Sequence, residues 1–209
     1  MKHSSSRLVT TIVDTLATTG CYVGPSLLSD GLTLRLSERL QWLESEGALQ
    51  AAKVGRSSGA RMNSSIRGDT TLWLDDAPQD EAEAAAVRVI DELREAVNQT
   101  LFLGAFETEL HYAHYPPGAG YAKHVDRFGD DDARVVSLVF YLNQHWAQDD
   151  GGQLAIYESA GALLQRVVPH AGTMVAFLSE RFPHEVLAAS KPRLSLTGWM
   201  RRRSSPRPR

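Results

Sequence analysis

The chain has 209 residues, of which 43% are hydrophobic and 22% are charged, so it can bury the core of one globular domain. Its net charge of −3 argues against nucleic acid as a partner, and its single cysteine, Cys21, excludes an intrachain disulfide. No stretch reaches the ~18 apolar residues that a membrane-spanning helix needs, so no membrane partner is expected. We expect a single domain over residues 1–200 in the reducing cytoplasm, followed by a basic tail over 201–209.

The first part of this domain, about 1–105, has mainly helical periodicity. Apolar residues recur at spacings of three and four over 4–18, and again after Ser29 and Asp30, which are plausible caps of a second helix. A third helix is predicted over 80–101, where acidic residues at the start suit the positive end of the helix dipole. The apolar faces of these helices indicate core packing.

Short strands are predicted for most of the remaining chain. A first strand over 70–74 follows a Ser/Gly-rich loop over 54–66. Beyond residue 106, strand-like segments alternate with turn clusters, at 109–115, 120–126, 134–142, 152–158, 172–178, 184–189 and 193–200. Many short strands at this spacing are typical of a β-barrel or jelly roll. The fold class we predict is therefore α+β, with a jelly-roll core over about 106–200 buttressed by the N-terminal helices.

Residues 124–126 (HVD) form the first candidate site. In a strand, residues i and i+2 point to the same face with Cα atoms roughly 6.5–7 Å apart, so His124 and Asp126 would aim an imidazole and a carboxylate at one point. The tripeptide alone is equally consistent with an ordinary surface pair. A metal would need a third ligand from elsewhere in the chain.

His184 is the best candidate for that ligand among the other histidines. It begins an apolar strand after Pro183, which restricts how the chain enters it. His111 and His114 are three residues apart on an earlier strand and face opposite sides. On its own, His184 is also consistent with a histidine satisfied in the core. Nine residues later, Arg193 begins another alternating strand.

These four residues form one chemical set. Two histidines and one carboxylate make the facial triad of non-haem Fe(II) oxygenases, which leaves coordination positions open for a 2-oxo acid and for O2. Arginine suits the distal carboxylate of such a co-substrate because its planar guanidinium pairs bidentately and stays charged. His124, Asp126, His184 and Arg193 together are far more specific than the tripeptide.

At this point the sequence resembles the Fe(II)- and 2-oxoglutarate-dependent oxygenases, and within them the oxygen-sensing type of prolyl hydroxylases and their bacterial relatives. The similarity covers about residues 60–200. It is carried by the blocks IRGDTTLW (66–73), YPPGAGYAKHVD (115–126), RVVSLVFYLN (134–143), DGGQLAIY (150–157), FPHEVLAA (182–189) and RLSLTGW (193–199).

The resemblance implies a double-stranded β-helix that holds iron through His124, Asp126 and His184. It also implies a 2-oxoglutarate pocket in which Arg193 grips the 5-carboxylate. The pocket residues implied beside it are Tyr141, which hydrogen-bonds the same carboxylate, Tyr115 near the inner end, and Thr197 and Trp199 as lining. Without the resemblance, Tyr141 and Trp199 are consistent with aromatic core residues.

The substrate side is implied by the IRGD stretch. In the relatives, its arginine and aspartate belong to a finger loop that closes over a peptide, and they match Arg67 and Asp69. Arg134 matches a position near the substrate entrance. From the residues alone, Asp69 is equally consistent with a turn residue before a strand. The YPPGAGY stretch is one residue shorter than the animal pattern, and 54–66 cannot be aligned, so substrate sequence is the least transferable property.

The function we predict is hydroxylation of a prolyl residue, presented by a protein in an extended loop, coupled to conversion of 2-oxoglutarate to succinate. Fe(II), 2-oxoglutarate and O2 are the expected cofactors, with ascorbate supportive, and the relatives suggest a translation elongation factor as a target. One alternative is a hydroxylase of a small molecule such as a free amino acid. Nucleic-acid demethylation is disfavoured because the repair enzymes carry a second arginine where this chain has Trp199. Another alternative is a non-catalytic Zn(II)-binding β-barrel, against which Arg193 and Tyr141 argue.

Overall fold

A computed structural model of the chain describes residues 2–52, 66–126 and 133–203. The Ser/Gly-rich segment over 54–65 and the end of the basic tail, 204–209, lie outside the described residues. Three α-helices form where the periodicity predicts them. They are α1 (Lys2–Thr18), α2 (Asp30–Ser45) and α3 (Glu81–Leu101).

The ends of these helices follow from local hydrogen bonding. The Ser29 side chain accepts a hydrogen bond from the Leu32 amide and begins α2. The Asp80 carboxylate caps α3 by accepting from the amides of Ala82 and Glu83. α3 ends where Phe102 takes a left-handed conformation with φ of 55°.

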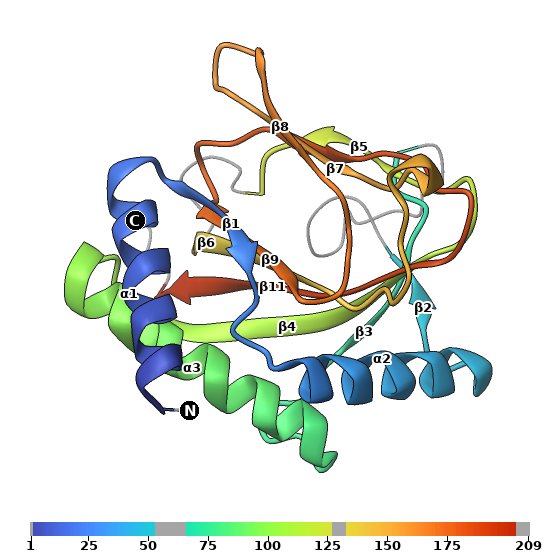
Figure 1. Cartoon of the computed structure of the whole chain (residues 1–209), viewed down its shortest axis with the longest axis horizontal. Helices are drawn as coiled ribbons and strands as arrows, with labels where there is room; N and C mark the ends of the chain where they lie inside the picture. Colours follow the sequence, from blue (N-terminus) through green and yellow to red (C-terminus); the bar gives the residue numbers. More distant parts are fainter. Residues whose placement is uncertain (1, 53–65, 127–132, 204–209) are drawn as a thin grey trace, which may run out of the picture.

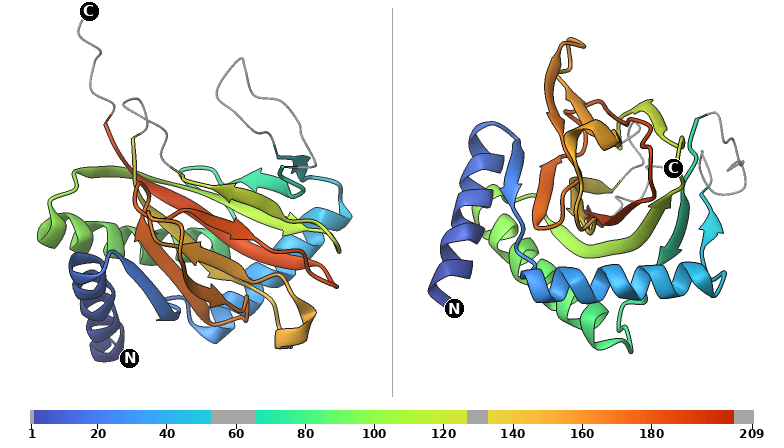
Figure 2. Two further views of the ribbon diagram at one scale, coloured as in Figure 1. Left: turned by 90° about the horizontal axis from the view of Figure 1, so that it is seen from above. Right: turned by 45° about the vertical axis from the view of Figure 1, so that its right-hand side comes forward.

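The strands of the described residues form two antiparallel sheets (Figure 1). The larger sheet has, in spatial order, β1 (Cys21–Pro25), β9 (Thr173–Leu178), β6 (Arg134–Tyr141), β11 (Arg193–Arg202), β4 (Ala105–Tyr115), β3 (Thr70–Trp73) and β2 (Gln50–Ala51). The smaller sheet has the order β5 (Tyr121–His124), β10 (His184–Val186), β7 (Leu154–Tyr157) and β8 (Leu163–Val167). The smaller sheet lies across from the larger one, as expected for a double-stranded β-helix (Figure 2).

The helices cover the outer face of the larger sheet (Figures 1 and 2). Side chains alternate along each strand, so β4 and β11 send one set of residues to the helices and the other set between the sheets. The set that faces the helices is apolar and buried, including Leu110, Leu194, Leu196 and Met200. The helices thus stabilise the sheet from outside and leave its inner face for a site.

Three strands lie where the sequence predicted none. β1 and β8 are edge strands of their sheets, and β2 has only two residues. β1 contains Gly24 and Pro25, and β8 exposes four consecutive residues, so neither shows a two-residue alternation. β1 forms because β9, far along the chain, offers a free edge, whereas β8 pairs with the preceding strand β7 across a short turn.

Several predicted strand boundaries were wrong, and two of them concern the site and the tail. β5 ends at His124, so Asp126 lies two residues beyond the strand and not on it. β11 continues to Arg202, so Arg201 belongs to the sheet and not to the tail; its guanidinium pairs with Glu107 and Glu109 of β4. Among the described residues, no helix is long and apolar enough to cross a membrane.

Candidate active site

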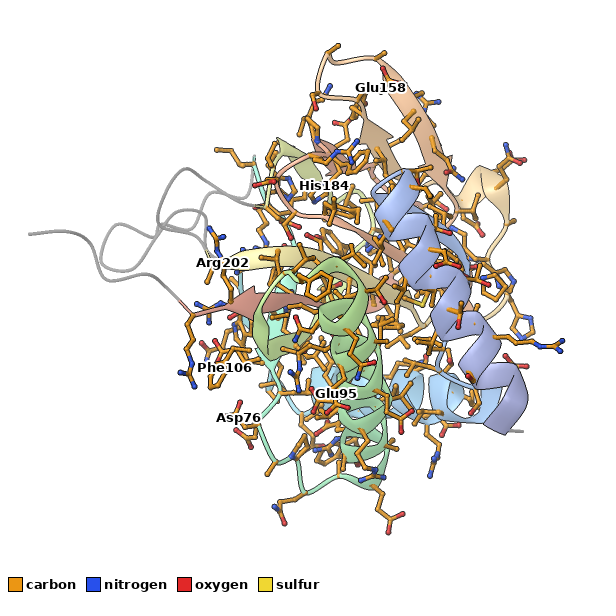
Figure 3. All side chains as sticks on the ribbon, turned by 90° about the vertical axis from the view of Figure 1, so that its left-hand side faces the viewer. Asp76, Glu95, Phe106, Glu158, His184 and Arg202 are labelled. Carbon is orange, nitrogen blue, oxygen red and sulfur yellow. The ribbon has the colours of Figure 1, made fainter. Side chains whose placement is uncertain are left out.

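His124 and His184 lie side by side at the smaller sheet. They occupy directly opposed positions in the antiparallel pair β5–β10, with ring centroids 4.3 Å apart. In Figure 3, His184 lies in the sheet region of the molecule, apart from Glu95 of α3. The Asp126 carboxylate completes the group, and the ligand atoms of the three residues all lie within 4.8 Å of one another. The pairing of β5 with β10 thus brings together the three ligands that the sequence predicted.

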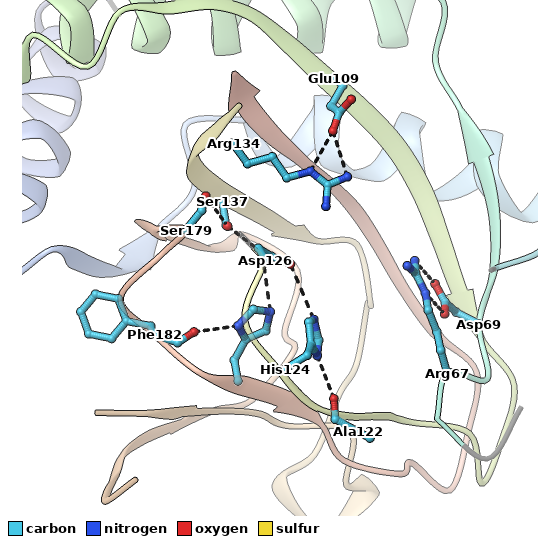
Figure 4. A network of polar contacts seen from close by, with 11 residues as sticks. Arg67, Asp69, Glu109, Ala122, His124, Asp126, Arg134, Ser137, Ser179 and Phe182 are labelled. Carbon is cyan, nitrogen blue, oxygen red and sulfur yellow. Dashed lines mark hydrogen bonds and ion pairs between the residues drawn. The ribbon is translucent and has the colours of Figure 1, made fainter. Parts of the chain in front are cut away.

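Backbone carbonyls orient both imidazoles (Figure 4). Nδ1 of His124 lies 2.8 Å from the Ala122 carbonyl oxygen, and Nδ1 of His184 lies 3.0 Å from that of Phe182. A carbonyl only accepts, so each Nδ1 carries the proton and donates. The lone pair is left on each Nε2, which faces Asp126 at 3.6 Å in both cases. This tautomer is the one a metal ligand requires.

The Asp126 carboxylate is buried and held by hydrogen bonds. Ser137 of β6 donates to it at 2.6 Å, and the Ser137 hydroxyl also lies 2.9 Å from that of Ser179. Burial alone would raise the pKa of Asp126, but His184, His124 and the Ser137 hydroxyl hold it below its usual range. Burial lowers the pKa of His184. A charged carboxylate beside a neutral imidazole is the protonation state that binds a cation.

The donor set therefore fits Fe(II). Imidazole and carboxylate suit non-haem iron, and all three groups line one cavity. The aromatic ring of Tyr121 stacks on that of His124, with ring centroids 3.7 Å apart. The Phe177 ring meets the His184 ring edge-on, with centroids 4.8 Å apart. These rings pack against the imidazoles and restrict their orientation.

Arg193 lies in the same cavity as the three ligands. Its side chain is 2% exposed, and its Nε donates to the Gly152 carbonyl at 2.9 Å. Among the described residues, no carboxylate pairs with it. A buried guanidinium without a counter-ion is costly, so the arrangement indicates a site for an anionic ligand. Gly152 has φ of +69°, and a side chain there would press on Arg193.

Tyr141 and Tyr115 flank this guanidinium. Its central carbon lies 5.2 Å from the centroid of each ring. The Tyr141 hydroxyl is buried, with no hydrogen-bond partner in the described part of the chain. Burial raises the pKa of Tyr141 to about 12 and also raises that of Tyr115, so both phenols stay protonated as donors. Thr197 and Trp199, the other residues predicted for the pocket, line the same cavity.

The residues predicted to meet a substrate are held by ion pairs (Figure 4). Arg67 and Asp69 form a bidentate pair at 2.7 and 2.9 Å, and of the two only Arg67 lines the cavity. The Arg67 guanidinium also lies 4.8 Å from the Tyr121 ring. Arg134 pairs with Glu109 at 3.0 Å and stacks on Trp199 at 3.5 Å. The Asp69 carboxylate is fully buried and holds the Arg67 guanidinium through this ion pair.

Ser137 and His111 are among the cavity residues for which the sequence predicted no site role. Ser137 is the one serine in the largely apolar strand RVVSLVFY, and that contrast was the available signal. His111 lines the cavity and is 1% exposed, whereas His114 points to the other side, as the three-residue spacing predicts. Nothing local distinguishes His111 from a core histidine.

The comparisons with known proteins agree with this geometry. The profile of the 2OG-Fe(II) oxygenase superfamily matches residues 110–201, which contain the three ligands and Arg193. The chain belongs to this superfamily, because a 44% identical prolyl-4-hydroxylase is also covered over 99% of its length.

Three similar proteins indicate which members of this superfamily the chain resembles. A crystal structure of a Pseudomonas putida prolyl-4-hydroxylase is 44% identical, with a TM-score of 0.84 over 93% of this chain and 99% of that one. A prolyl hydroxylase from Trichoplax adhaerens, in complex with a hypoxia inducible factor oxygen degradation domain peptide fragment, is 27% identical, with a TM-score of 0.85 over 95% and 91%. Human Egl nine homolog 1 is 33% identical over 142 residues, which are 64% of this chain. The chain matches only 33% of the length of that human protein.

Proposed function

We propose that the protein is an Fe(II)- and 2-oxoglutarate-dependent dioxygenase that hydroxylates a prolyl residue of a protein. The observation that carries the proposal is one cavity that contains both a two-histidine, one-carboxylate ligand set and the buried Arg193 without a carboxylate partner in the described chain. A structural zinc site would have no use for that guanidinium. The names of the similar prolyl hydroxylases support the prolyl substrate.

His124 and His184, through Nε2, and Asp126, through its carboxylate, would hold the iron. Iron held there would supply, with 2-oxoglutarate and O2, the chemistry that hydroxylates an unactivated C–H bond and converts 2-oxoglutarate to succinate and CO2. Ser137 keeps the Asp126 carboxylate charged and oriented through its 2.6 Å hydrogen bond. The Ala122 and Phe182 carbonyls keep each histidine proton on Nδ1.

The 2-oxoglutarate would be oriented by the opposite end of the cavity. Arg193 pairs with its distal carboxylate, and the Tyr141 hydroxyl donates to the same group. Tyr115, opposite Arg193 in the strand pair, and Thr197 line the same cavity. Apolar residues, among them Leu154 and Phe177, wall the cavity and exclude water, which strengthens each polar contact.

The protein substrate would enter past Arg67 and Arg134. Both guanidiniums are held by carboxylates, Asp69 and Glu109, and both lie at the cavity. A fixed guanidinium can bind peptide carbonyl groups, which suits a proline presented in an extended loop. A translation elongation factor is the first candidate substrate to test.

The test measures succinate formation and prolyl oxidation together. The purified protein, with Fe(II), ascorbate and 2-oxoglutarate, is added to a desalted lysate of cells that lack its gene, and proteins are analysed by mass spectrometry. We expect succinate formation and the gain of one oxygen atom at a proline, neither of which occurs with an Asp126→Ala variant. Succinate formation stimulated only by the small-molecule fraction would overturn the protein substrate. Zn(II) retention without succinate would overturn the oxygenase.

A further inference from the structure

Four planar side chains stack across the inner face of the larger sheet. Each comes from a different strand, and the four strands are neighbours: Trp73 on β3, His111 on β4, Trp199 on β11 and Arg134 on β6. Ring centroids are 4.7 Å apart from Trp73 to His111 and 5.3 Å from His111 to Trp199, and the Arg134 guanidinium lies 3.5 Å from Trp199. We call these four residues the aromatic column.

Two nitrogen atoms in the column have no hydrogen-bond partner in the described part of the chain. They are Nδ1 of His111 and Nε1 of Trp199, and both atoms are buried. A buried polar group without a partner costs ~1–3 kcal/mol, so such groups are rare and usually meet a ligand or water. Both residues line the cavity. The unpaired nitrogens therefore indicate a polar ligand on this wall.

The register of the strands places the column at the level of the metal ligands. Trp199 is opposite Ser137, whose hydroxyl binds Asp126, and His111 is opposite Thr197. Arg193 lies four residues before Thr197 on the same strand, roughly 13 Å along its backbone. A co-substrate held by Arg193 would reach the metal from that side. The aromatic column lies at the other end of this stretch of β11, level with the metal ligands. The reacting part of the substrate would lie there.

The imidazole of His111 is neutral at physiological pH. Burial, with the nearby charges of Arg67 and Arg134, lowers its pKa to about 3. A neutral imidazole has one donor and one acceptor, and an indole N–H is a donor. A peptide backbone offers the complementary groups, an N–H and a C=O. An anionic ligand would instead favour a charged imidazole here.

We propose that His111 and Trp199 bind the substrate backbone next to the target proline, with His111 as a specificity-determining residue for an extended peptide segment. This inference rests on the proposed prolyl hydroxylation. The stacking between Trp73 and Trp199 holds the imidazole in one plane, so that its nitrogen is presented without loss of side-chain freedom on binding. A proline whose neighbouring peptide group cannot reach His111 and Trp199 would be a poor substrate.

The experiment compares two substitutions of His111. His111→Phe keeps the stacking and removes the ring nitrogens, whereas His111→Gln restores an amide donor and acceptor. The probe is a synthetic peptide that spans the proline oxidised in the lysate experiment. For His111→Phe we expect the KM for this peptide to rise about tenfold, while the KM for 2-oxoglutarate changes less than about twofold. His111→Gln should recover most of the loss.

His114→Gln is the matched control, since this histidine lies on the same strand and faces the helix side. It should leave the KM for the peptide unchanged. Circular dichroism establishes that each variant folds, and if His111→Phe does not, His111→Met replaces it. Equal peptide KM values for wild type and the apolar variant would overturn the inference, as would parallel rises in both KM values. Succinate formation by the wild type without any prolyl oxidation would overturn the proposed function itself.

Discussion

The two faces of the larger sheet are built from the same strands but have different roles. On β11, Leu194 and Leu196 point to the helices and join an apolar core, while Arg193 and Thr197 line the cavity. The helix-facing side buries carbon, which stabilises the fold. Among the described residues, the cavity-facing side buries the Arg193 guanidinium without a carboxylate partner, and the His111 Nδ1 atom and the Tyr141 hydroxyl without a hydrogen-bond partner. Stability and ligand binding are thus separated by the alternation of single residues.

The largest expected effect is on the cavity side. Asp126→Ala removes the one carboxylate of the ligand set, so we expect succinate formation to fall by more than about a thousandfold, equivalent to ~4 kcal/mol. The iron content after dialysis, measured by atomic absorption, should fall with it. Asp126→Asn is the matched variant with the same shape. Retained iron and activity in both variants would contradict the assigned ligand set.

A helix-facing substitution should instead affect stability. Leu196 is 0% exposed, so Leu196→Ala should lower the free energy of unfolding by ~2–5 kcal/mol, measured by urea denaturation. The KM for 2-oxoglutarate should not change in the folded fraction. Leu163→Ala on the edge strand β8 is the control, because Leu163 is 47% exposed. A comparable loss at Leu163 would mean that exposure does not separate the two sites.

Arg193 tests whether the cavity contributes to binding rather than to folding. Arg193→Gln removes the partner of the 2-oxoglutarate carboxylate, and we expect its KM to rise about a hundredfold, or ~3 kcal/mol. Tyr141→Phe removes one neutral donor and should raise it about fivefold. The thermal midpoint of the ligand-free Arg193→Gln protein should not fall, since an unpaired buried charge is removed. A destabilised variant with an unchanged KM would reverse this assignment.

His111 should add a pH dependence to stability. Its pKa in the folded state is about 3, below the ~6.5 of an unfolded histidine, so the unfolded chain binds the proton more readily. Stability is therefore lost as the pH falls below 6.5. Between pH 7 and pH 5 the loss from this group is ~2 kcal/mol. Urea denaturation of metal-free wild type and His111→Phe at both pH values should show this difference, whereas identical pH dependences would contradict it.

Several site residues could be predicted because their chemistry is local. The spacing of His124 and Asp126, and the positions of His184 and Arg193 at strand starts, indicate a metal and a carboxylate pocket. The three helices were predicted equally well, since a period of three to four residues is a property of a single segment. Edge strand β1 was missed because its partner β9 is distant in the chain, and β8 was missed because its burial shows no two-residue alternation.

Taken alone, the sequence determined which groups could bind a metal and an anion, because residue type and short spacing carry that chemistry. Only the tertiary structure decided how these groups meet. β5 ends at His124, yet Ser137 from β6 holds the Asp126 carboxylate beside both histidines. Arg67 is paired with Asp69. His111 stacks between two tryptophan rings, and its Nδ1 atom has no hydrogen-bond partner among the described residues. Such outcomes depend on strand register, since a shift of one residue would move His111 to the helix side.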